Sequence, residues 1–158
     1  MHRRLVDRRV RGVFAAIGRH DYAAVLAGLA ADVHHRFAGD HPLGGERHDR
    51  DAVALWFARL GRLFPGLDFD VRSVTVSGLP WRLTVTVEWL AQVTPAAGPR
   101  YTNAGAHVLR LRRGQVVCLH AYEDSQAVAA ACALMHEAGM AEAAAAPITG
   151  SGQAPSSP

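Results

Sequence analysis

Residues 101–123 read YTNAGAHVLRLRRGQVVCLHAYE, and this segment carries the clearest structural signal in the chain. Apolar residues alternate with polar or charged ones before and after Arg113-Gly114, as they do in two antiparallel strands joined by a tight turn. Arg110 and Arg112 belong to the even-numbered set of the first strand, so the odd-numbered set is expected to face the interior. The inward set is Tyr101, Asn103, Gly105, His107, Leu109 and Leu111.

The same alternation assigns faces in the neighbouring strands. In residues 82–94 the inward set contains Val85, Val87 and Trp89. In residues 115–123 it contains Leu119, Ala121 and Glu123, which leaves His120, Tyr122 and Asp124 on the other side. With a further strand at residues 67–76, the second half of the chain predicts a meander of four long strands separated by turns.

The first half of the chain has helical periodicity instead. Residues 5–17 place apolar side chains on one face of an amphipathic helix. Asp21 can cap a second, short helix, and Asp49 or Asp51 can begin a longer one. Between them, residues 32–38 alternate as a short strand with His35 on its apolar side, and a Gly- and Pro-rich loop follows.

The end of the chain changes composition. Ser125 can cap a last helix that runs to about residue 137. Residues 141–158 are rich in Ala, Pro, Ser and Gly, so we expect a disordered tail after a single domain over residues 1–140. This order of elements predicts an α+β fold in which helices pack on the concave face of a curved antiparallel sheet.

Composition limits the partners and the location. The chain has 158 residues, 49% hydrophobic and 20% charged, which suits one globular domain. Its 17 basic residues are all arginines and are scattered among acidic ones, so we expect no nucleic-acid partner. No apolar run reaches the ~18 residues of a membrane span, so we expect no membrane partner. Cys118 and Cys132 lie in apolar runs as buried, reduced thiols would, which favours a cytoplasmic location.

Two segments resemble the SnoaL-like polyketide cyclases and ketosteroid isomerases of the nuclear-transport-factor-2-like superfamily. The first is ADVHHRFAG at residues 31–39 with HPLGG at 41–45 and RDAVALWF at 50–57. The second runs from Tyr101 to Asp124 through the turn at Gly114. The resemblance implies a cone-shaped α+β domain that encloses a small-molecule pocket.

The functional residues of ketosteroid isomerases can be matched to positions in this sequence. Their general base lies in an Asp-Pro-Val-Gly-type loop, which residues 40–44 resemble with one inserted residue, so Asp40 is a candidate base. His107 stands where they carry a proton-donating acid. The tyrosine of their first helix is missing here. Limonene epoxide hydrolases share the fold, but Ala121 stands where their second carboxylate would be.

The inward-facing polar residues suggest acid–base chemistry. His107 can donate or accept a proton near neutral pH, and Asn103 on the same face can polarise a carbonyl. His107 and His35 would form a polar pair across the pocket, although each could equally be a hydrogen-bonded core residue. SnoaL-like proteins use an acid near the end of the last strand. Strand parity favours Glu123 for that role, and Asp124 is the alternative unless it caps the final helix.

The remaining candidates for substrate contact are aromatic or inward-facing residues. They are Phe14, Trp56, Trp81, Trp89, Tyr101 and Ala121. The aromatic members could equally be core residues. Four further histidines, His34, His41, His48 and His120, show no ligand spacing in the sequence, so we expect no metal site.

These observations predict a cofactor-independent enzyme with a hydrophobic pocket that carries out proton transfer on a carbonyl compound, as an isomerase or an aldol-type cyclase. Asp40 or Glu123 would be the base and His107 the donor. A non-catalytic ligand-binding or accessory protein of the same fold is the alternative. A homodimer formed through the outer sheet face is also expected.

Overall fold

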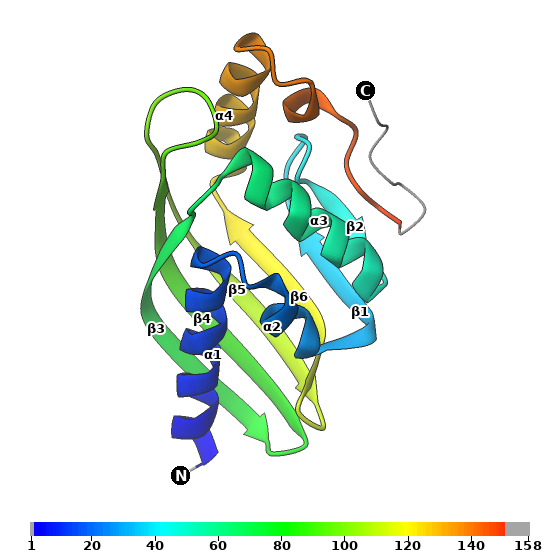
Figure 1. Ribbon diagram of the computed structural model, residues 1–158. Coiled ribbons are helices and arrows are strands. Elements are labelled where there is room, and N and C mark those ends of the chain that lie inside the picture. The colour runs from blue at the N-terminus through cyan, green and yellow to red at the C-terminus, as the bar shows by residue number, and fades with distance from the viewer. Residues whose placement is uncertain (1, 151–158) are drawn as a thin grey trace.

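The centre of the protein is one six-stranded sheet, seen in a computed structural model that describes residues 2–150 (Figure 1). In spatial order the strands are β2 (Gly45–Arg47), β1 (Leu29–Phe37), β6 (Gln115–Glu123), β5 (Tyr101–Arg112), β4 (Arg82–Val93) and β3 (Asp68–Leu79). The sheet is curved and its edges do not close.

One pair of strands departs from the predicted antiparallel sheet. β1 and β6 run parallel, and every other neighbouring pair is antiparallel. Strands β3 to β6 follow one another through short connections, which impose antiparallel pairing. β1 reaches the sheet from the helices instead, so no hairpin sets its direction. The α+β architecture itself is as predicted.

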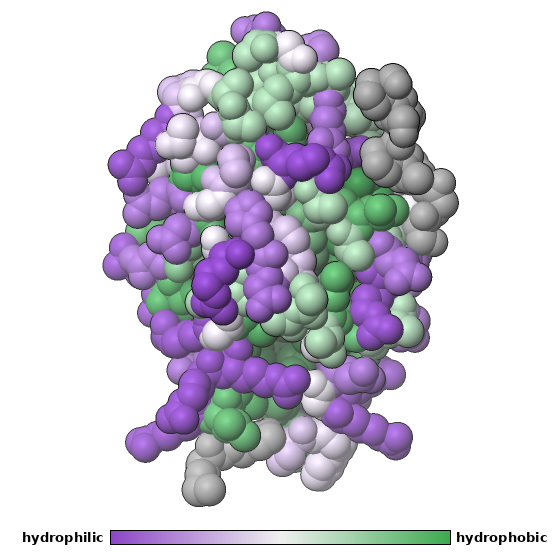
Figure 2. Space-filling view, in the orientation of Figure 1, coloured by the Kyte–Doolittle hydropathy of each residue, from purple (hydrophilic) through white to green (hydrophobic). Residues whose placement is uncertain are grey.

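Helices α1 (His2–Gly18), α2 (Tyr22–Ala27) and α3 (Arg50–Leu63) cover one face of the sheet (Figure 1). The predicted caps are present: Asp21 Oδ1 accepts from Ala24 N at 3.3 Å and Asp49 Oδ1 accepts from Ala52 N at 2.7 Å. The exposed side of α1 carries arginines, and Figure 2 shows hydrophilic residues over this helix. Its apolar side packs on β3.

Strand parity is confirmed in β4 and β5. Val85 and Val87 have no exposed surface and Trp89 is buried, while Glu88 between them is exposed. The β5–β6 turn places Arg113 at φ 49° and Gly114 at φ 83°, as a two-residue hairpin loop requires.

The predicted disordered tail is wrong for residues 141–150. After α4 (Ser125–Glu137), a 3₁₀ turn η1 (Ala141–Ala144) and an extended segment pack beside α3, with Ala143 and Ile148 buried. Arg59 Nη1 donates to the Ala146 carbonyl at 2.8 Å, and Arg47 Nη1 donates to that of Ile148 at 2.9 Å. Composition could not show this, because the anchoring groups are backbone carbonyls and one carboxylate, that of Glu142, which accepts from Arg62 Nε at 2.7 Å. The rest of the predicted tail, 151–158, lies outside the described residues.

Candidate functional site

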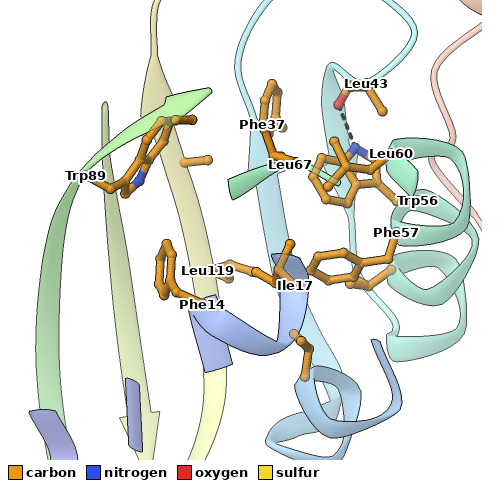
Figure 3. Packing of buried hydrophobic residues seen from close by; sticks show 14 of the residues in the cluster. Phe14, Ile17, Phe37, Leu43, Trp56, Phe57, Leu60, Leu67, Trp89 and Leu119 are labelled. Carbon is orange, nitrogen blue, oxygen red and sulfur yellow. Dashed lines mark hydrogen bonds between the residues drawn. The ribbon is translucent and has the colours of Figure 1, made fainter. Parts of the chain in front are cut away.

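A cavity of about 130 Å³ lies between the three N-terminal helices and the inner face of the sheet. Its walls are mainly apolar and aromatic, and Figure 3 shows Phe14, Trp56 and Trp89 around this interior. Trp56 is fixed by a hydrogen bond from its Nε1 to the Leu43 carbonyl at 2.7 Å. Arg9 on α1 and Gly114 in the β5–β6 turn also contribute to the lining.

His107, on β5, is one of the few polar groups that line the cavity. Its Nδ1 accepts a hydrogen bond from Trp89 Nε1 at 2.7 Å, and its ring meets Phe14 edge to face with centroids 5.3 Å apart. Burial lowers the pKa of His107 to about 4. The ring of His107 is therefore neutral at neutral pH.

His35, on β1, lines another part of the same cavity. Its Nδ1 accepts from Arg47 Nε at 2.9 Å, and its ring lies edge to face against Trp56 with centroids 4.6 Å apart. Burial and, after it, the Arg47 cation hold the pKa of His35 well below its usual range. His35 and His107 share the cavity as expected, but each has its own hydrogen-bond donor.

These donors fix the tautomer of both rings. Arginine Nε and tryptophan Nε1 can only donate, so the Nδ1 atoms of His35 and His107 must carry lone pairs. In a neutral ring the proton then sits on Nε2. Within residues 2–150 neither Nε2–H is hydrogen-bonded to the protein. The cavity therefore offers two N–H donors and no histidine cation.

Glu123, at the end of β6, is the acid that faces the cavity. Its Oε2 accepts from Asn103 Nδ2 at 3.2 Å. Burial, with a smaller contribution from the charge of Asp124, raises the pKa of Glu123 to about 8. Near neutral pH this carboxyl group can both give and take a proton.

Asn103 is buried and its amide is occupied by the protein. Nδ2 also lies 2.5 Å from Tyr101 Oη and 3.1 Å from the Asp124 carbonyl, while Oδ1 accepts from the backbone N–H groups of Ala104 and Asp124. This network holds the Glu123 side chain and the end of β6. Asn103 does not line the cavity, whereas Tyr101 does, and burial raises the pKa of its hydroxyl.

Gly105 makes room for this arrangement. It pairs with Trp89 on one side and with Glu123 on the other. A Cβ atom here would lie 2.4 Å from the Tyr122 carbonyl oxygen, 2.7 Å from Trp89 Cζ2 and 2.9 Å from Glu123 Cβ. The missing side chain lets the Trp89 indole lie across β5 and reach His107.

Two predicted catalytic acids do not face the cavity. Asp40 is exposed, because the loop buries His41 instead, whose ring packs on Phe37 and hydrogen-bonds to the Ala38 carbonyl at 3.0 Å. Asp124 is also exposed, and its Oδ1 caps α4 by accepting from Gln126 N and Ala127 N. Of the two candidate acids at the end of β6, Glu123 lines the cavity and Asp124 does not.

Most of the predicted contact residues do line the cavity. They are Phe14, His35, Trp56, Trp89, Tyr101, His107 and Glu123. Ala121 is buried on the inner face but is not part of the lining. Trp81 is 62% exposed, because it lies at the β3–β4 turn.

Two important residues were not predicted. Phe69 on β3 lines the cavity and contacts Trp89 edge to face at 5.0 Å, and alternation with Leu67 and Val71 could have identified it. Arg47 has no exposed surface, although it lies between the exposed Glu46 and His48. No sequence pattern marks it, since its partners are His35 and backbone carbonyls.

Of residues 2–150, no helix combines the length and apolar character needed to cross a bilayer. The cellular location and the outer-face homodimer stay predictions.

Comparisons with known proteins agree with this architecture. The family profile described as SnoaL-like domain matches residues 10–119. None of the curated proteins compared with the chain matches it. A solved NTF2-like protein from Burkholderia thailandensis is 27% identical, with 78% of this chain and 94% of that chain covered and a TM-score of 0.67.

Two further solved structures share the fold. A protein named as a polyketide cyclase, from Xanthomonas campestris pv. campestris, is 22% identical, with 80% and 95% of the two chains covered and a TM-score of 0.58. A protein named as a scytalone dehydratase, from Novosphingobium aromaticivorans, is 14% identical, with 76% and 82% covered and a TM-score of 0.67. Since the profile covers more than half of the sequence, the chain belongs to the SnoaL-like domain family, with an NTF2-like fold.

Proposed function

We propose that this protein is a cofactor-independent enzyme that transfers a proton on a small cyclic carbonyl compound, in the manner of an isomerase or an aldol-type cyclase. The observation that carries the proposal is Glu123, a carboxyl group whose pKa is raised to about 8 inside an apolar cavity. Such a group is suited to removing a proton from carbon next to a carbonyl at neutral pH.

The chemistry can be written with the residues in place. The carboxylate of Glu123 takes a proton from the carbon beside the carbonyl, and the C–H electron pair forms the enolate double bond. Negative charge then develops on the carbonyl oxygen. In this scheme the Nε2–H of His107 donates to that oxygen in a site of low dielectric, where such a donor is most effective. Glu123 then returns the proton to another carbon, or an electrophilic carbon captures the enolate.

The supporting residues have separate tasks in this scheme. Trp89 holds His107 in the tautomer that donates from Nε2. Asn103 orients Glu123 through the 3.2 Å hydrogen bond and is a positioning residue. Gly105 pairs with Glu123 on β6, and His107 is two residues further along β5, so acid and donor are diagonal neighbours whose backbone positions are about 7–8 Å apart. A six-membered ring fits between them.

The cavity limits the substrate. Its volume of about 130 Å³ is close to the ~150 Å³ of an apolar cavity that accepts one benzene ring, and below the ~300–1,000 Å³ of drug-sized sites. We therefore propose a ligand with one ring, or two fused rings, and a carbonyl group.

The first experiment looks for proton transfer without knowing the natural substrate. Cyclohexenones, tetralones and hydroxynaphthoquinones are screened by thermal shift. Each ligand found is incubated with the protein in D₂O, and deuterium uptake beside the carbonyl is followed by NMR. Glu123→Gln keeps the shape of the side chain, and we expect it to lower the exchange rate at least ~100-fold while ligand affinity changes little. The matched control is Glu88→Gln, since Glu88 lies exposed on the outer face.

The pH profile adds a second readout. The ionised form of Glu123 is the base, so exchange should rise with pH and level off above the pKa of about 8. Glu123→Gln should abolish that rise. Binding without catalysed exchange would support the non-catalytic alternative, and exchange that survives in Glu123→Gln would remove Glu123 from the mechanism.

A further inference from the structure

A second group of polar side chains gathers on the other face of the sheet, where β1, β2 and β6 meet. His34 and Cys118 are register partners in the parallel β1–β6 pair, and His120 lies two residues beyond Cys118 on the same side of β6. Their ligand atoms all lie within 4.8 Å of one another. The spacing of these residues in the sequence predicted no metal site, because Cys118 comes 84 positions after His34.

The separation of the two nitrogens matches a metal site. His34 Nδ1 and His120 Nε2 are 3.4 Å apart. Zinc–nitrogen bonds are about 2.0–2.1 Å long, and two such ligands at a tetrahedral angle lie about 3.4 Å from each other. The two rings, whose planes are 87° apart, therefore already have the spacing that a shared cation needs.

Glu46 prepares His34 for this role. His34 Nε2 lies 2.8 Å from Glu46 Oε2, and a carboxylate only accepts, so the proton of a neutral ring is on Nε2. The lone pair is then on Nδ1, which faces His120. A metal-bound histidine almost always donates its other N–H to such an outer partner.

We propose that His34, Cys118 and His120 bind a zinc-like divalent transition-metal cation on the outer face of the sheet, with Glu46 orienting His34. Imidazole nitrogen and thiolate sulfur are both preferred ligands of Zn²⁺, and three protein ligands leave a fourth position for water. Binding releases the thiol proton of Cys118. The site is separate from the cavity, because His34 and His120 point to the opposite side from their neighbours His35 and Leu119.

Nearby arginines limit the affinity. Arg36 lies opposite His120 in the register, and Arg110 lies opposite Cys118. The charge of Arg36 is offset by Glu46, whose Oε1 is 3.6 Å from Arg36 Nε, and the thiolate of Cys118 offsets that of Arg110. We expect tighter binding than that of an isolated surface histidine and weaker binding than that of a four-ligand structural zinc site.

A competing group shares His34. Glu46 and His48 also lie within 4.8 Å of it, and the rings of His34 and His48 stack with centroids 4.6 Å apart. This set is less suitable because it is more exposed. It would also use the His34 nitrogen that already donates to Glu46 at 2.8 Å.

The test uses the full chain without a histidine tag. Zn²⁺ binding is measured by calorimetry, and Co²⁺ is used as a spectroscopic probe because thiolate ligation gives an intense near-ultraviolet charge-transfer band. We expect one ion per chain and a thiolate band. Cys118→Ser should abolish the band, Cys118→Ser and His120→Ala should each weaken Zn²⁺ binding at least ~100-fold, and Glu46→Gln should weaken it ~10-fold or more.

The controls separate this site from other histidines and thiols. Cys132→Ala removes the other cysteine, which is buried against the core, and His136→Ala removes an exposed histidine on α4. Both should leave binding unchanged, as should His48→Ala. Thermal unfolding without metal checks that each variant folds. The proposal is overturned if the wild-type protein binds no Zn²⁺, if Cys118→Ser keeps the band, or if His48→Ala removes binding while His120→Ala does not.

Discussion

The adjacent histidines His34 and His35 on β1 lie on opposite faces of the sheet and have different surroundings. His35 is buried on the inner face, and its Nδ1 receives an N–H from Arg47. His34 is half-buried on the outer face, and its Nε2 donates to the Glu46 carboxylate. The partner decides which ring nitrogen carries the proton. The inner histidine therefore presents an N–H donor to a cavity, and the outer one presents a lone pair.

A second difference concerns charge. The cavity keeps two of its titratable groups neutral, with His107 deprotonated and Glu123 protonated over part of the neutral range. The outer face carries charged side chains that form ion pairs, such as Arg36 with Glu46. Burial explains both outcomes, because an enclosed charge loses hydration that an exposed one keeps.

The largest difference in stability between the two faces should appear when the buried Arg47 and the exposed Arg36 are replaced in turn. Arg47 has no exposed surface and donates to His35 Nδ1 and to the carbonyls of Gly44, Gly45 and Ile148. Arg47→Leu leaves these acceptors buried without a donor, so we expect a loss of about 3–5 kcal/mol in the free energy of unfolding, measured with urea.

The control for that experiment is Arg36→Leu. Arg36 is exposed and forms only a surface ion pair with Glu46 at 3.6 Å, so its loss should cost less than about 0.5 kcal/mol. Limited proteolysis adds a structural readout, since Arg47→Leu should also release the segment that carries Ile148. Equal losses in the two variants would show that burial does not distinguish these arginines.

The sequence predicted the inner face better than the loops and edges. Alternation along β5 and β6 correctly turned His107 and Glu123 inward, because strand parity depends only on local geometry. Asp40 was predicted differently, from the resemblance of its loop to that of ketosteroid isomerases, and it is exposed instead of facing the cavity. Which residue of that loop is buried depends on Phe37, whose ring His41 packs against.

Long-range pairing explains the rest. Arg47 is buried because carbonyls from residues 44, 45 and 148 surround it, and no pattern near Arg47 reports those partners. The cluster of His34, Cys118 and His120 likewise exists only because β1 and β6 run parallel in one register. Parity could show that these side chains share a face, but only the topology brings them together.

The second largest effect should be a loss of stability on acidification that comes from His107 on the inner face. His107 has an ordinary pKa of 6.5 in the unfolded chain and about 4 in the fold, so the unfolded chain binds the proton first. Its contribution to stability is intact above pH 6.5 and falls as the pH drops toward 4, by up to about 3 kcal/mol. The other titratable groups that line the cavity are Arg9, His35, Tyr101 and Glu123.

The variant that isolates this contribution is His107→Gln, which keeps an acceptor for Trp89. Glu123 acts in the opposite direction, since its raised pKa costs stability as the pH rises from 4.5 to about 8. The stability difference between wild type and His107→Gln should therefore be compared at pH 7 and pH 4.5. On going from pH 7 to pH 4.5, we expect the free energy of unfolding of the variant to gain about 2 kcal/mol relative to that of the wild type. A constant difference would mean that His107 titrates normally in the fold.

The smallest effect should come from one added methyl group on β5. Gly105→Ala places a Cβ atom 2.4 Å from the Tyr122 carbonyl oxygen and 2.7 Å from Trp89 Cζ2, so strand or indole must move. We expect a loss of about 1–2 kcal/mol in the free energy of unfolding. Ala104→Ser, on the exposed side of the same strand, is the control and should cost less than about 0.5 kcal/mol.

Gly105→Ala also tests what lowers the pKa of His107. If Trp89 is displaced, its N–H no longer reaches His107 Nδ1, and water can follow into the gap. The pKa of His107, measured by NMR, should then rise from about 4 toward its ordinary 6.5. Destabilisation with an unchanged pKa would show that β5 moved as a whole and kept the Trp89–His107 pair. In that case the neutral state of His107 depends on enclosure by the walls of the cavity and not on the space left at Gly105.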